Sequence, residues 1–176
     1  VSPELNSRAQ VQAEGNNTNT SIIGVVPEYE AAHSMILEDG NFVTDQQYRS
    51  GSRVAVLGPT TRDDLFGVGG DAIGKEIKIG TTRITVIGVT KSKGGSGFGN
   101  ADDRIFIPLT TSLRYLAGGI YISTIAVTTE NQEDLVELQT QITELLLERH
   151  NKKTAAEADF SIFNQADLAS TAQSIT

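Results

Sequence analysis

Hydrophobic residues alternate with polar residues over several short segments of the chain, a spacing that is typical of β-strands. In the clearest pair of segments, Ile77 and Ile79 flank a lysine, and Ile84 and Val86 flank a threonine. Gly80 lies between these two segments, so we expect them to form a hairpin. Further strands are predicted over residues 5–13, 21–26, 53–57, 105–107, 121–127 and 160–163.

Other hydrophobic residues recur at the spacing of a helix, most clearly in the last third of the chain. A long helix is predicted to begin near Asn131, and its apolar side chains fall on one face: Leu135, Leu138, Ile142, Leu145 and Leu146. The repeat is too short for a coiled coil, so we interpret this face as core that packs against a sheet. Shorter helices are predicted within residues 27–40, from Thr60 or Thr61 to Phe66, from Thr110 or Thr111 to Gly118, and from Asn164 to the end of the chain.

The distribution of glycine and charge along the chain predicts two lobes. Residues 51–104 hold 12 of the 17 glycines and carry a net charge of +2, whereas the remainder carries −10. A change of composition within one chain indicates one lobe inserted into another. With the alternating strands and helices of the last third, this predicts an α+β fold: a split β-α-β lobe over residues 1–50 and 105–176, and a small inserted α/β lobe over residues 51–104.

The overall composition excludes several classes of function. A net charge of −8 and a pI near 4.7 would repel phosphate groups, so we expect no nucleic-acid partner. The chain has no cysteine and two histidines, so we expect no thiolate or histidine-rich metal site and no other cofactor. No apolar stretch approaches the roughly 20 residues that cross a bilayer, and the first residues do not resemble a signal peptide.

One segment has the spacing of a phosphate-binding loop. Residues 69–75 match G-x-x-x-x-G-K, but Glu76 stands where a serine or threonine would bind Mg²⁺, and a strand follows in place of a helix. We interpret the segment as a turn that enters the hairpin. The chain carries no G-x-S-x-G signature or other catalytic motif, so we expect no enzymatic activity.

Residues 94–100 are rich in glycine and serine and are predicted to form a flexible loop. Phe98 is an aromatic residue in this polar loop, and we predict that it contacts a partner protein together with Asn100 and Asp102. A loop that packs its own aromatic residue is the alternative. Asp102 and Asp103 fit ordinary surface charge, although Asp102, next to a predicted strand, also fits an anchor for the loop.

Several segments, in order along the chain, resemble one known family. They are Tyr29 to Leu37 with the following Gly40 and F-V-T, V-A-V-L-G with D-L-F-G (54–67), I-G-K-E-I-K-I with V-I-G-V (73–89), the run from Asp103 to P-L-T (108–110), and D-F with N-Q-A-D-L (159–168). This series is similar to the extracytoplasmic domain of the macrolide-exporter (MacB-like) family of ABC transporter permeases. Asn41 departs from the family, which usually has arginine there.

The resemblance implies a two-lobed extracytoplasmic domain, in which a porter-type α+β lobe is built from the two ends of the chain. It implies that ATP is hydrolysed in the cytoplasm and that this domain converts the resulting motion into movement outside the membrane. The domain would bind an adaptor protein or a substrate for export. Both ends of the chain would join membrane helices, through which the native transporter would form a dimer.

Three alternatives stay open from the sequence. A hydrolase or lyase with paired carboxylates would leave no sequence motif, and a deep pocket with two facing carboxylates would favour it. A small-ligand-binding module outside the cytoplasm would show a closed cleft between the lobes. A permease domain of the lipoprotein-releasing or cell-division type would belong to the same family, and dependence on an adaptor would separate it from an exporter.

Overall fold

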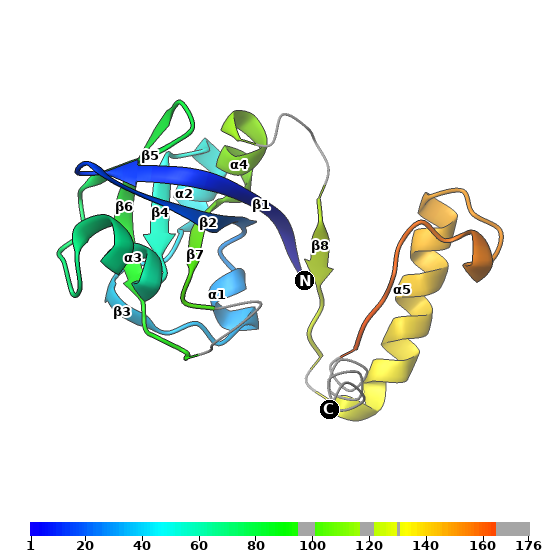
Figure 1. The fold of residues 1–176 in the computed structure, drawn as a ribbon. Helices are drawn as coiled ribbons and strands as arrows, with labels where there is room; N and C mark the ends of the chain where they lie inside the picture. Colours follow the sequence, from blue (N-terminus) through cyan, green and yellow to red (C-terminus); the bar gives the residue numbers. More distant parts are fainter. Residues whose placement is uncertain (95–100, 117–121, 130, 165–176) are drawn as a thin grey trace, which may run out of the picture. The chain divides into compact units, whose positions relative to one another are not determined.

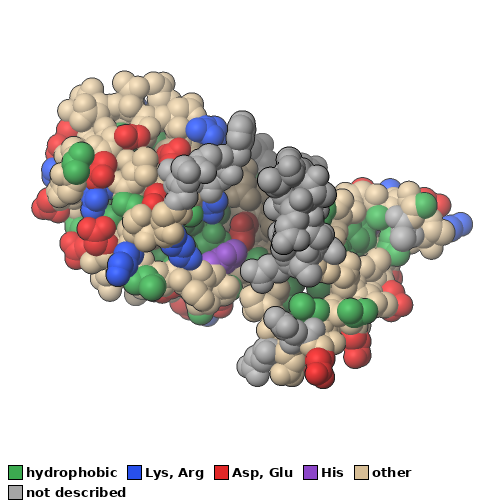
Figure 2. All heavy atoms as spheres, turned by 60° about the horizontal axis from the view of Figure 1, so that its bottom comes forward, with side chains coloured by type: hydrophobic (Ala, Val, Ile, Leu, Met, Phe, Trp, Pro, Cys, Tyr) green, Lys and Arg blue, Asp and Glu red, His purple; other side chains and the backbone are tan. Residues whose placement is uncertain are grey.

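The computed structural model describes residues 1–94, 101–116, 122–129 and 131–164 of the chain. It divides into two compact units, Val1–Thr128 and Thr129–Thr176 (Figure 1). Acidic and basic side chains are interspersed with uncharged surface on the face that Figure 2 shows. Helices and strands both contribute, so the predicted α+β class with two lobes is confirmed.

The first unit is built on one sheet, whose strand order is β2-β7-β4-β6-β5-β1-β8. Its strands are β1 (Ser2–Ala13), β2 (Asn16–Val25), β4 (Val54–Leu57), β5 (Glu76–Ile79), β6 (Thr82–Thr90), β7 (Arg104–Pro108) and β8 (Thr124–Ala126), and β3 (Leu37–Gly40) pairs with β6. Residues 5–13 of β1 also pair with β2, while residues 2–4 pair with β8. The path from β2 to β1 therefore closes into a small barrel.

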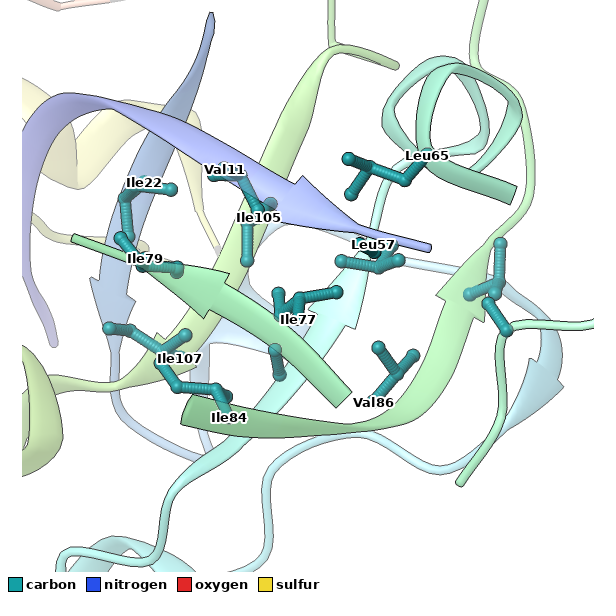
Figure 3. Packing of buried hydrophobic residues seen from close by; sticks show 14 residues of the cluster. Val11, Ile22, Leu57, Leu65, Ile77, Ile79, Ile84, Val86, Ile105 and Ile107 are labelled. Carbon is teal, nitrogen blue, oxygen red and sulfur yellow. The ribbon is translucent and has the colours of Figure 1, made fainter. Parts of the chain in front are cut away.

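The barrel is filled by aliphatic side chains that point toward one another from every strand of the ring (Figure 3). The members of this cluster that Figure 3 labels are Val11, Ile22, Leu57, Leu65, Ile77, Ile79, Ile84, Val86, Ile105 and Ile107, and each is at most 1% exposed. Leu65 comes from α3 (Pro59–Phe66), which lies over one end of the barrel. Burying each such side chain contributes about 1.5–3 kcal/mol, so this cluster is the main source of stability in the unit.

A second cluster lies on the outside of the same strands. Successive residues of a strand point to opposite sides, so Ile105 and Ile107 face the interior while Phe106 faces outward. The Phe106 ring packs against Tyr29 and Phe42, with ring centroids 5.5 and 6.0 Å apart. Tyr29 begins the short helix α1 (Tyr29–Ala32), so this cluster attaches the helix to the barrel.

Side-chain hydrogen bonds hold two further helices, one by a cap at its start and one by a contact with a distant segment. In α2 (Asp45–Ser50), Thr44 and Gln47 form a capping box, which satisfies two backbone N–H groups at the start of the helix. Gly51 ends this helix in the left-handed region, with φ +64°. In α4 (Leu109–Tyr115), the Thr111 hydroxyl donates to the Ser52 carbonyl at 2.8 Å and ties the helix to the segment after α2.

The boundaries between the units differ from the predicted ones. Residues 51–104 were expected to form a separate inserted lobe, yet β4 pairs with β7 and β5 pairs with β1. These pairs join the glycine-rich segment to both flanking segments within one barrel. The division into compact units falls instead at Thr128, because a shared sheet and a shared core hold together everything before it.

The predicted helix over residues 27–40 is also corrected. The helix α1 ends at Ala32, and Ser34 adopts a left-handed conformation with φ +46°, which a helix cannot include. Residues 37–40 then extend and pair with β6 as β3, so Gly40 ends a strand and not a helix.

The second unit contains the long helix α5 (Leu135–Arg149), preceded by η1 (Gln132–Asp134) and followed by η2 (Ala155–Glu157). The helix is where the leucine spacing predicts it, but none of its residues is buried, and Leu145 is 50% exposed. Residues 160–163 were predicted as a strand and have no regular structure. A single extended segment with no strand beside it leaves its backbone groups unpaired, so no strand forms here in the described part of this unit. Without a sheet in that part, the predicted packing of the leucine face against a sheet is not found there either. The predicted helix after Asn164 lies outside the described residues.

Candidate functional site

Asp102 lies at the base of the glycine-rich loop, two residues before β7 begins. Its side chain is buried, and its carboxylate accepts hydrogen bonds from the Ser92 hydroxyl at 2.5 Å and the Lys93 N–H at 2.9 Å. Ser92 and Lys93 lie two and three residues after the end of β6, so this carboxylate joins the two ends of the segment that connects β6 to β7.

Burial alone would disfavour the charged form of Asp102, but the hydrogen bonds from Ser92 and from the Lys93 and Gly94 backbones outweigh it. The pKa of Asp102 therefore lies below its ordinary value. The Asp102 carbonyl also accepts from the Thr60 N–H at 3.1 Å, at the start of α3. A Cβ atom on Gly58 would lie 2.2 Å from that carbonyl oxygen, so only glycine fits at this position.

These contacts support the anchoring role for Asp102 that the sequence left as an alternative to surface charge. Phe98 and Asn100, the other two predicted contact residues, lie outside the described residues. The structure therefore brings Asp102 to the base of the loop, and the partner contact of all three residues stays a prediction.

A partly buried polar cluster beside the loop base was not predicted from the sequence. The Glu4 side chain, 10% exposed, lies with Oε1 3.1 Å from His33 Nε2, and the His33 ring stacks on Tyr29 with centroids 4.0 Å apart. The Lys93 ammonium donates to the His33 carbonyl at 2.8 Å, which links this cluster to the loop base. Burial and, second, the Glu4 charge raise the pKa of Tyr29 to about 12, so this phenol stays neutral near neutral pH.

The sequence carries no local signal for this cluster, because Glu4 lies among other polar residues of its strand. Its partner His33 lies 29 residues away, directly after a helix whose docking on the strand the sequence does not specify. His150, by contrast, directly follows α5, and its Nδ1 lies 2.6 Å from Asp159 Oδ1.

Two surface hollows lie near these residues. The larger, of about 560 Å³, is lined mostly by polar side chains: Glu4, Asn6, Ser7, Arg8, Ser21, Ile23 and Arg104. Pockets of this size that bind small molecules are lined mainly by apolar and aromatic groups, so this lining does not fit such a ligand. The smaller hollow, beside Tyr29, His33 and Asp102, has a volume of about 60 Å³, room for about two water molecules.

The segment with phosphate-loop spacing leads into a strand, as predicted. β5 begins at Glu76, directly after the lysine, so no helix N-terminus faces the glycines. Lys75 is engaged elsewhere: its ammonium lies 2.9 Å from Glu14 Oε1 and 5.1 Å from the centre of the Phe66 ring. Within the described residues, no group of three or more histidine, cysteine or acidic side chains is arranged to hold a metal ion.

The fold and these contacts define a two-unit α+β domain with a filled barrel and an anchored loop. Residues 1–145 match the family model of the MacB-like periplasmic core domain. The chain is 34% identical over 169 residues to a macrolide export ATP-binding/permease protein MacB of Bdellovibrio bacteriovorus, and 34% identical over 170 residues to that of Rhodospirillum rubrum. Each alignment covers 96% of this chain, which spans about a quarter of the length of these relatives (26% and 25%).

Solved structures show the same fold. The periplasmic region of MacB from Actinobacillus actinomycetemcomitans matches with a TM-score of 0.77 and 20% identity, over 99% of this chain and 76% of that one. The extracellular domain of the noncanonic ABC-type transporter YknZ from Gram-positive bacteria matches with a TM-score of 0.76 and 21% identity, over 88% and 77% of the two chains.

The chain belongs to the MacB-like periplasmic core domain family, which confirms the resemblance seen in its sequence. It is the extracytoplasmic domain of a MacB-like ABC transporter permease. Among the described residues, no helix has the length and apolar character required to span a membrane.

Proposed function

We propose that this domain is a non-catalytic coupling element, which passes movement driven by cytoplasmic ATP hydrolysis to partners outside the membrane. The observation that carries the proposal is the filled barrel, whose labelled core residues are at most 1% exposed. Rearranging a close-packed core costs several kcal/mol, so the barrel moves as a rigid body. A rigid body can transmit a displacement from one of its ends to the other.

The same observation disfavours the alternative of a small-ligand-binding module. In the part of the first unit that the structure describes, side chains occupy the barrel interior. The larger surface hollow is polar, and its lining residues Arg8 and Glu4 already bond Asn19 and His33.

The partner in this proposal is an adaptor protein that contacts Phe98, Asn100 and the surface around Asp102. The anchored base supports this assignment, because Asp102 fixes Ser92 and Lys93 and so determines where the loop leaves the barrel. A contact residue on such a loop loses less conformational entropy on binding than one on a loop without an anchor.

The exported substrate in this proposal is inferred from the names of the relatives. Their names describe macrolide export, which favours an exporter over a lipoprotein-releasing permease. We extend that activity to the whole transporter that carries this domain, with membrane helices that anchor it and form a dimer.

The test uses the intact transporter with the double substitution Phe98→Ala and Asn100→Ala. We expect co-purification of the adaptor and macrolide export by cells to fall together, while basal ATP hydrolysis stays unchanged. The matched control is Val68→Ala, which shortens an apolar side chain in another glycine-rich loop, where Val68 is 93% exposed. This control should leave adaptor binding and export intact.

Full adaptor binding and full export by the double variant would contradict the assigned contact. If export persists in a transporter whose entire extracytoplasmic domain is deleted, the coupling function itself is wrong. The two measurements therefore separate an error in the contact site from an error in the function.

A further inference from the structure

Two arginines gather around one exposed tyrosine at the end of α4. The guanidinium carbon of Arg53 lies 5.4 Å from the centre of the Tyr115 ring, and that of Arg114 lies 6.0 Å from it. All three side chains are exposed, Tyr115 by 40%. We call Arg53, Arg114 and Tyr115 the arginine–tyrosine surface.

Folded elements hold this surface in place. Arg114 and Tyr115 are the last two residues of α4, and Arg53 directly precedes β4. A Cβ atom on Gly51 would lie 3.1 Å from Arg114 Nη1, so the guanidinium occupies the space that a glycine leaves open. The hydrogen bond from Thr111 to the Ser52 carbonyl keeps α4 beside this segment.

The guanidinium groups of Arg53 and Arg114 have unused hydrogen-bonding capacity. Neither guanidinium donates a hydrogen bond to a described residue or has a described carboxylate within 4.0 Å. By contrast, Arg49 is paired with Asp45 at 2.8 Å, and Arg83 is paired with Glu76 at 3.8 Å. A guanidinium has five N–H donors directed along its edges, and a contact with an aromatic ring leaves those donors available.

We infer that the arginine–tyrosine surface binds an acidic segment of a partner protein, through carboxylates that accept from both guanidinium groups. Two like charges beside one ring repel each other, and a carboxylate between them relieves that repulsion. No described carboxylate lies within 4.0 Å of either guanidinium, so this face offers uncompensated positive charge to an acidic partner. Arginine and tyrosine are also the residue types that dominate binding energy at protein interfaces. The inference does not depend on the proposed coupling function.

The test measures binding of a fluorescently labelled hexaglutamate peptide to the 176-residue chain by anisotropy, with hexaglutamine as the neutral probe. We expect saturable binding of hexaglutamate only, weakened when salt rises from 0.05 to 0.5 M because exposed charges are screened. The substitutions Arg53→Gln and Arg114→Gln together should raise the Kd about tenfold or more. The matched control, Arg49→Gln with Arg83→Gln, removes the same total charge and should change the Kd less than about twofold.

A second measurement keeps the test decisive if the double variant fails to fold. In the unsubstituted chain, hexaglutamate should shift the NMR signals of the Tyr115 ring and of both guanidinium groups. The inference is overturned if these signals do not move, or if both double variants lose binding equally, since the peptide then senses only net charge. It is also overturned if vesicles of anionic phospholipid bind in an Arg53- and Arg114-dependent way while the peptide does not, because the surface would then recognise lipid.

Discussion

Replacing Asp102 by asparagine tests the anchor of the glycine-rich loop directly. The carboxylate accepts from Ser92 and from the Lys93 N–H, at 2.5 and 2.9 Å. A hydrogen bond to a charged acceptor contributes about 1.5–3 kcal/mol, and one to a neutral acceptor contributes about 0.5–1.5 kcal/mol. Removing the charge therefore costs roughly 1 to 1.5 kcal/mol for each bond. We expect Asp102→Asn to lower the free energy of unfolding by about 2–3 kcal/mol at pH 7.

The loss of stability should depend on pH in a specific direction. The pKa of Asp102 is lowered in the folded chain from its ordinary value of 3.8, so the folded state favours the ionised form. This contribution is fully present above pH 3.8 and disappears as the pH falls through the lower folded-state pKa. A protonated aspartic acid resembles asparagine, so the unsubstituted chain and the variant should converge in stability below that pKa.

Urea unfolding of both chains between pH 2 and 8 measures this difference, while the other carboxylates contribute equally to both and cancel. Asp71→Asn is the control, because Asp71 is exposed and, among the described residues, accepts only a long bond, from the Ile73 N–H at 3.3 Å. It should change the free energy of unfolding by less than about 0.5 kcal/mol. A constant gap between chain and variant down to pH 2, or no gap at pH 7, would refute the anchoring role.

Three further substitutions test the fold, each by the free energy of unfolding in urea. Phe106→Ala removes a ring that is 1% exposed and should cost about 3–5 kcal/mol; a cost below 1 kcal/mol would mean that the outer aromatic cluster is loosely packed. Gly58→Ala forces a Cβ against the Asp102 carbonyl and should cost about 1–3 kcal/mol, and a neutral result would show that the α3 start can shift. Thr44→Ala removes the capping box of α2 and should cost about 1 kcal/mol, whereas an unchanged stability would mean that water replaces the cap.

Local elements of the fold could be predicted because their signals lie within a few residues of one another. The hairpin at Gly80 follows from alternating aliphatic residues on both sides of a turn, and β5 and β6 pair around it. Closure of the barrel could not be predicted in the same way. It depends on Val11 lying opposite Ile79 and Val56 opposite Phe106, and alternation indicates which face a residue occupies but not which strand lies beside it.

The same distinction between local signals and tertiary contacts applies to the candidate site. The anchoring role of Asp102 could be proposed because Asp102 lies between the glycine-rich loop and a predicted strand, although its partners Ser92 and Lys93 could not be named. The contact of Glu4 with His33 depends on how α1 docks onto β1, which is a tertiary property. The family could be identified from a series of segments in order, since such a series reflects the whole arrangement without specifying any single contact.

The charged side chains of the first unit fall into two groups. Some already have hydrogen-bond partners within the chain, and others donate to no described residue. Glu4 and Asp102 are buried and already bond His33 and the loop base, so a partner could use them only by breaking those bonds. Arg53 and Arg114 are exposed, are oriented by Tyr115 and donate to no described residue, so a partner gains their hydrogen bonds without an internal loss. Recognition by this domain should therefore depend on exposed arginines and loop residues, while the buried carboxylates determine where those residues are held.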